Sequence, residues 1–185
     1  MPQRIRCTDE EWAAFEHGLA PFESQGLERF RKEIRHLLAE GGHGDIANAF
    51  ADDFPRVSLR FTQWFGRRQH AGLRHAQLAA GKFGFYVYRC YSGESCSGRH
   101  GELDGIVLPS DHPFWMDHVA PNDWLCACYV LGARSERGAA RLGGQLGKIF
   151  PANWRDGRFV SPPFRGNNLP STRDALEAIL DGSFT

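Results

Sequence analysis

The stretch from Cys96 to Val130 constrains what this chain can fold into more than any other part of the sequence. It holds three of the five cysteines, three of the eight histidines and two of the five tryptophans. Side chains that bind metals therefore lie beside large apolar anchors and turn-forming residues within one short segment. The remainder of the chain has ordinary helix and strand patterns, so we interpret it as a scaffold around this segment.

Two cysteines two positions apart, Cys126 and Cys128, predict half of a metal site. On a strand over residues 125–131, their side chains would lie on one face, about 6–7 Å apart at the backbone. Two thiolates so placed can reach one ion, since a Zn–S bond is about 2.3 Å long. An upstream cysteine and histidine in a loop supply two more ligands, and His118 is a further candidate. The structural zinc site predicted from these residues consists of Cys96, His100, Cys126 and Cys128.

Two other interpretations of these residues stay open. The cysteine pair also fits small buried apolar residues on a strand, and His100 fits a hydrogen bond within a turn. A disulfide from Cys96 to one of the pair is the other arrangement, and it requires an oxidising destination. The first residues, MPQRIRCTDEEW, lack the apolar segment of a secretory signal. Synthesis in a reducing cytoplasm is therefore the expectation, which favours thiols or metal ligands.

Aromatic residues and prolines predict how the same segment is held in place. Trp115 and Trp124 are expected to act as anchors, each with a partner for its indole N–H. Prolines, Pro121 among them, stiffen the loop. Asp104-Gly105 predicts a hairpin turn, and the carboxylate of Asp111 is expected to cap the turn that follows it. Structural roles therefore account for most of the segment.

The first 80 residues are expected to form helices. Capping patterns and apolar spacing predict one helix after Thr8-Asp9-Glu10-Glu11, a second over 24–41, and a short third over 45–54 that Pro55 ends. A fourth helix, over 56–80, has an apolar side and a basic side. The basic side is most simply a solvated face. Contact with DNA is the alternative interpretation for Arg60, Arg67, Arg68 and Arg74.

The pattern changes from helix to strand after Gly81. Aromatic and β-branched runs predict strands over 83–91, 106–108 and 125–131. A short helix is expected over 135–146, and the Pro- and Gly-rich segment 150–170 is expected to be irregular. The capping box that begins at Ser171 predicts a last helix.

These elements predict an α+β fold, with N-terminal helices followed by a small antiparallel sheet domain that has a Cys/His-pinned loop and a C-terminal helix. The expected division is a helical region over 1–80 and a small α+β domain over 81–185. The formal net charge is zero, which excludes a protein that is basic as a whole. No apolar run approaches the ~20 residues of a membrane span, so no membrane partner is expected.

The segment from His100 to Cys128 resembles the phage Mu F-like, or head morphogenesis, minor head proteins. Members of that family read approximately Arg-x-x-His, a Leu-x-Gly turn, Asp-x-Pro-x-Trp, and then Pro-Pro-Asn-Gly-Trp-x-Cys-Arg-Cys. The matching residues fall in the same order, and they are His100, Leu103, Gly105, Asp111, Pro113, Trp115, Pro121, Asn122, Trp124, Cys126 and Cys128. The resemblance covers roughly residues 67–144. Ala120, Asp123 and Ala127 depart from it, and the last removes a charge between the two cysteines.

This resemblance implies a structural virion protein without catalytic residues. Family members are associated with the portal vertex or the interior of the capsid, and they support head assembly and DNA delivery. The implied partners are the portal protein, the major capsid protein and the packaged DNA. The implied location is the virion, after synthesis in the host cytoplasm. A bound metal is often suspected in relatives that have more Cys and His residues in this segment.

A second resemblance, to HNH-type nucleases, rests on Asp117-His118-Val119-Ala120-Pro121. In such enzymes the histidine is the general base, and the acidic residue and a later histidine hold a divalent ion. In this chain Asn122 follows at once, which leaves no room for the intervening hairpin, and no histidine lies downstream of His118. A metal-dependent nuclease and a zinc-stabilised DNA-binding module are therefore the alternatives to a head protein.

Overall fold

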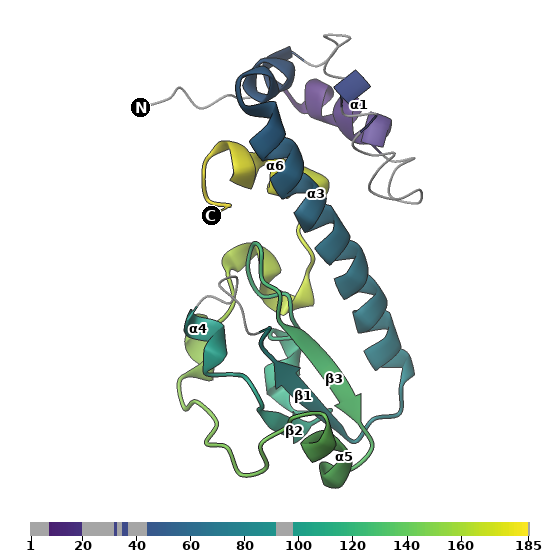
Figure 1. The fold of residues 1–185 in the computed structure, drawn as a ribbon, viewed down its shortest axis with the longest axis vertical. Helices are drawn as coiled ribbons and strands as arrows, with labels where there is room; N and C mark the ends of the chain where they lie inside the picture. The colour runs from purple at the N-terminus through teal and green to yellow at the C-terminus, as the bar shows by residue number, and fades with distance from the viewer. Residues whose placement is uncertain (1–7, 20–31, 33–34, 37–43, 92–97, 185) are drawn as a thin grey trace. The chain divides into compact units, whose positions relative to one another are not determined.

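The computed structural model describes residues 8–19, 32, 35–36, 44–91 and 98–184 (Figure 1). The chain divides into two compact units. Residues 1–66 and 170–185 make up the first unit, and residues 67–169 make up the second. This division differs from the one expected at residue 80, because one long helix contributes to both units and the C-terminal helix belongs with the first.

The first unit contains helices α1 (Asp9–Leu19) and α6 (Thr172–Leu180), together with the beginning of α3 (Gly44–Ala80). The predicted capping box at Ser171 is present, and its hydroxyl accepts a hydrogen bond from the amide of Asp174. Arg173 of α6 binds Asp9 of α1 at 3.1 Å and lies over the ring of Trp12. The C-terminal helix therefore contacts the first helix within this unit.

The expected break at Pro55 is wrong, because α3 is continuous from Gly44 to Ala80 with Pro55 inside it. A proline inside a helix removes one hydrogen bond and its ring crowds the carbonyl four residues earlier, at a cost of about 3 kcal/mol, and burial of a long apolar face can outweigh that cost. Val57, Phe61 and Phe65 are all at most 2% exposed. The helix expected over 24–41 lies mostly outside the described residues.

A three-stranded sheet forms the centre of the second unit. Its strands are β1 (Phe85–Arg89), β2 (Val107–Pro109) and β3 (Tyr129–Ala133), in the order β2-β1-β3 with both pairs antiparallel. Adjacent side chains of β1 point to opposite faces. Val87 packs with Ala133 on one face, and Tyr88 belongs to the larger aromatic core on the other. The predicted α+β fold is confirmed.

The aromatic core on that face is built around Phe114. This residue lies in the short 3-10 helix η2 (Pro113–Met116) and is fully buried. Its ring contacts those of Trp115 at 4.9 Å and His118 at 4.2 Å. Trp154 and Phe159, from the segment expected to be irregular, complete the core, and this segment contains two 3-10 helices, η3 (Trp154–Asp156) and η4 (Pro162–Asn167). Among the described helices, none is long and apolar enough to cross a membrane.

Three local predictions differ from the structure. The third strand starts at Tyr129 rather than at residue 125, because Cys126 and Cys128 precede the paired segment. The turn at Asp104-Gly105 forms, but it leads from the short helix α4 (Gly98–Gly101) into β2 rather than joining two paired strands. The cap of the turn before Phe114 comes from His112, whose Nδ1 accepts the Phe114 amide at 3.2 Å, and not from Asp111.

Candidate metal centre

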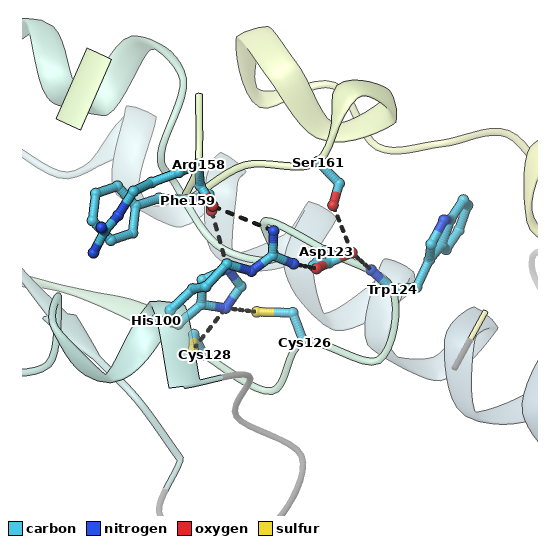
Figure 2. Close-up of polar contacts among 9 residues, drawn as sticks. His100, Asp123, Trp124, Cys126, Cys128, Arg158, Phe159 and Ser161 are labelled. Carbon is cyan, nitrogen blue, oxygen red and sulfur yellow. Dashed lines mark hydrogen bonds and ion pairs between the residues drawn. The ribbon is translucent and has the colours of Figure 1, made fainter. Parts of the chain in front are cut away.

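Three buried side chains, His100, Cys126 and Cys128, converge in the second unit (Figure 2). They are 1%, 5% and 7% exposed, respectively. The Nδ1 atom of His100 lies 3.4 Å from the Sγ of Cys126 and 3.8 Å from the Sγ of Cys128. All three ligand atoms lie within 4.8 Å of one another. This cluster could hold a metal ion.

The imidazole of His100 is oriented by a backbone carbonyl. His100 lies on α4, and its Nε2 is 3.0 Å from the carbonyl oxygen of Phe159. Because a carbonyl oxygen can only accept, Nε2 carries a proton, and in the neutral ring Nδ1 presents its lone pair toward the two sulfur atoms. Metal-binding histidines are typically held in this way, with the second ring nitrogen donating to a carbonyl or carboxylate.

A tight turn over residues 123–126 presents the first thiol. The amide of Cys126 donates to the carbonyl of Asp123 at 3.1 Å. Leu125 has a φ of 57°, a left-handed conformation that costs a non-glycine residue on the order of 1–3 kcal/mol. Arg67 donates to the carbonyl of Leu125. Such strain persists only where surrounding contacts enforce it, so this turn is held firmly.

The side chain of Asp123 provides most of those contacts. One of its oxygens accepts from the Trp124 amide at 2.8 Å and from the Ser161 hydroxyl at 2.7 Å. The other forms an ion pair with Arg99 at 2.7 Å, and Arg99 directly precedes His100 in the sequence. Asp123 therefore connects the turn that presents Cys126 to the helix that carries the histidine.

The pKa values of the two thiols are shifted in opposite directions. A hydrogen bond from Cys128 holds the pKa of Cys126 well below its usual value, and His100 adds to this effect. The pKa of Cys128 is raised because it donates that hydrogen bond and because it is buried. Cys126 is therefore the more acidic of the two thiols. Because a metal ion binds thiolates rather than thiols, a cation that binds here would displace the thiol proton of Cys128.

Polar groups behind the cluster support the second thiol. The hydroxyl of Tyr88, on β1, hydrogen-bonds with Cys128 and accepts from the Asn122 side chain at 3.1 Å. Burial raises the pKa of Tyr88, and nearby negative charge on Cys126 and Cys128 raises it further. Tyr88 therefore stays neutral, and its O–H can stabilise a thiolate at Cys128.

Of the two remaining predicted ligands, Cys96 lies outside the described residues, and His118 is held in the aromatic core. His118 is 3% exposed and stacks on Phe114, and its Nδ1 donates to the Phe114 carbonyl at 3.1 Å. Burial lowers its pKa.

The predicted anchors lie around the core. Trp115 donates its indole N–H to the carbonyl of Pro109 at 2.9 Å, and Trp124 packs edge-on against Phe164 at 5.0 Å. The bond between Ala120 and Pro121 is cis. Asp111 is exposed.

The arginines of α3 make contacts within the protein. Arg67 and Arg68 are half-buried, as are Arg60 and Arg74. The contacts are Arg60 to the Phe184 carbonyl, Arg67 to the Leu125 carbonyl, and Arg74 to the Gln77 side chain at 3.2 Å. These bonds satisfy part of the guanidinium groups of Arg60, Arg67 and Arg74 without nucleic acid, and DNA contact stays a prediction.

Sequence reasoning did not identify Cys90, Tyr88 or the Phe159 carbonyl as neighbours of the cluster. Cys90 follows β1 directly, and its Sγ lies 3.4 Å from that of Cys128. The signal that could have found it is the pairing of β1 with β3, since Arg89 pairs with Tyr129 and one further step brings Cys90 opposite Cys128. Comparisons with protein-family models, curated proteins and solved structures found no match for this chain.

Proposed function

We propose that this protein is a non-enzymatic phage minor head protein of the Mu F-like type, which works as a structural part of the virion. Its place is the portal vertex or the inner face of the capsid, with portal or major capsid protein as its partner and packaged DNA nearby. It supports head assembly and DNA packaging or delivery.

One observation carries this proposal. Most of the residues responsible for the resemblance are buried in the folded chain. Leu103 and Asn122 are fully buried, and His100, Cys126 and Cys128 are nearly so. Their burial supports a structural role for the segment that carries the resemblance.

We further propose that the cluster of His100, Cys126 and Cys128 holds a structural zinc ion. In a tetrahedral site with Zn–S near 2.3 Å and Zn–N near 2.1 Å, sulfur and nitrogen ligands are about 3.6 Å apart. The two separations from His100 Nδ1, 3.4 and 3.8 Å, lie on either side of that value. Thiolate and imidazole donors together favour zinc over magnesium or calcium, which prefer oxygen.

A nuclease is the second candidate, because Asp117 and His118 match part of the HNH pattern. The contacts of this pair favour a structural role. His118 stacks in the aromatic core, and the carboxylate of Asp117 accepts the Gly166 amide at 3.1 Å. Plasmid incubated with the protein and Mg²⁺ or Mn²⁺ should stay intact. Cleavage that His118→Ala abolishes would support the nuclease instead.

The main test is assembly. The tagged chain should be co-expressed with the portal and major capsid proteins of the phage that encodes it, and the particles purified by sedimentation. We expect the chain to co-sediment with heads in a few copies. Cys128→Ser should enter heads less well than the matched control Cys7→Ser. A stable chain that stays monomeric and never enters particles would contradict the proposal.

A further inference from the structure

The sulfur of Cys90 lies beside the proposed zinc ligands. Its Sγ is 3.4 Å from the Sγ of Cys128, and the side chain is half-buried rather than sealed in the core. Cys90 is disulfide-bonded. Neither the cysteine spacing nor the family resemblance gave this residue a role.

The position of Cys90 is fixed by the sheet. The β1–β3 register pairs Arg89 with Tyr129, and one step beyond this pair Cys90 lies opposite Cys128. Opposite residues of antiparallel strands have Cβ atoms about 4.5–5.5 Å apart, which suits two sulfurs that share an ion. The carboxylate of Asp104 also holds this point of the chain, because it accepts the Cys90 amide at 2.8 Å and Arg89 at 3.0 Å.

The distance between the sulfur atoms of Cys90 and Cys128 is close to that expected for two thiolates bound to one zinc ion. Two thiolates on one tetrahedral zinc are about 3.8 Å apart, close to the 3.4 Å between Cys90 and Cys128. His100, Cys126 and Cys128 supply three ligands, whereas structural zinc sites have four. Cys90 is half-buried and its sulfur lies beside one of these three ligands, which makes it the candidate for the fourth.

We infer that Cys90 is the fourth ligand of the metal centre and that its disulfide controls zinc binding. This inference rests on the proposed zinc site and adds its regulation. A sulfur within a disulfide has no thiolate to offer. A dithiol reductant supplies two electrons and two protons, breaks the S–S bond and becomes a disulfide itself. Cys90 then loses its thiol proton as it binds the cation.

Two states of the protein follow. The oxidised protein has three ligands and binds zinc weakly, while the reduced protein closes a Cys₃His site and binds it tightly. The expected difference in zinc affinity is about 100-fold or more, since losing even an outer hydrogen-bond partner costs 10–100-fold. Zinc would therefore stabilise the folded protein more in a reducing compartment than in an oxidising one.

The test measures zinc affinity and sulfur coordination on the full chain. Protein is reduced with a dithiol, desalted under nitrogen and titrated with Zn²⁺ against a chromogenic chelator. Zinc-edge X-ray absorption counts the sulfur ligands. We expect three sulfurs in the reduced wild type and two in the oxidised wild type. Reduced Cys90→Ser should show two sulfurs and weak binding, while reduced Cys7→Ser and Cys96→Ser should show three.

Each result decides a different question. Three sulfurs or unchanged affinity in Cys90→Ser overturns the role of Cys90, as does a count that falls to two in Cys96→Ser alone. Two sulfurs in the reduced wild type overturns the role of Cys90 but leaves the zinc site in place. No zinc binding at all overturns the zinc site itself.

A second measurement uses only the wild type, so it tests the role of Cys90 even if Cys90→Ser fails to fold. Reduced protein is alkylated with and without zinc, and modification of Cys90 is followed by peptide mass spectrometry. Zinc should slow alkylation of Cys90 at least 10-fold. Equal rates with and without zinc would overturn the inference.

Discussion

Zinc should stabilise the second unit of this protein by an amount that can be estimated. Ligation joins His100 on α4 to thiols 26 and 28 residues further along the chain. An ion that binds only the folded state adds about 2.7 kcal/mol at a free concentration of 100 times its Kd. For a unit of 103 residues (169 − 67 + 1), each kcal/mol shifts Tm by about 4 °C or more. Zinc should therefore raise the Tm of this unit by about 10 °C.

Differential scanning calorimetry of the reduced protein, with excess zinc and with EDTA, measures this shift. His100→Ala should lose the zinc-dependent increment. In EDTA it should also lose about 1–3 kcal/mol, because the buried Phe159 carbonyl is left without its donor. His70→Ala, at an exposed position of α3, is the matched control and should keep the full increment. The same Tm with zinc and with EDTA in the wild type would refute the reasoning.

Three further predictions concern other parts of the chain. Trp115→Phe should lower the free energy of unfolding by about 1 kcal/mol in a urea titration, because the hydrogen bond from the indole N–H to the Pro109 carbonyl is lost while the His112 amide still donates to that carbonyl; an unchanged free energy of unfolding would contradict it. Burial lowers the pKa of His118, so the unfolded chain binds its proton first as the pH falls. In EDTA, the contribution of His118 to the free energy of unfolding should be fully present above pH 6.5 and should be lost as the pH falls through the folded-state pKa. The free energy of unfolding of His118→Gln should therefore fall less steeply with pH than that of the wild type; equal slopes would exclude His118 as the titrating group. Ser171→Ala should destabilise the first unit by about 1 kcal/mol through loss of its helix cap, as measured by calorimetry; an unchanged transition would contradict this.

Features that depend on neighbours in sequence were predictable. The cap at Ser171, the strand around Val87 and the buried face that includes Phe61 follow from local side-chain chemistry and spacing. The helix break at Pro55 was a local prediction too, and it failed because the penalty of about 3 kcal/mol for a proline inside a helix is smaller than the gain from burying a long helical face. Whether a local cost such as that of Pro55 exceeds the gain from packing against residues far away in sequence cannot be decided from the sequence alone.

The structure also revised how the two thiols are presented. Alternation along a strand correctly predicts that Cys126 and Cys128 face the same way. The paired strand nevertheless begins only after them, and the turn at Leu125 sets their position. That turn depends on Asp123 and Arg67, whose contacts are made with parts of the chain far away in sequence.

The sequence by itself determined which donors are present, because a metal site can only use the thiols and imidazoles that the chain contains. It also determined that His100, Cys126 and Cys128 belong to one apolar, turn-rich segment. Only the tertiary structure decided that Cys90 and Tyr88 stand beside them. The reason is strand register, which places β1 against β3 and depends on the packing of both faces of the sheet rather than on spacing along the chain.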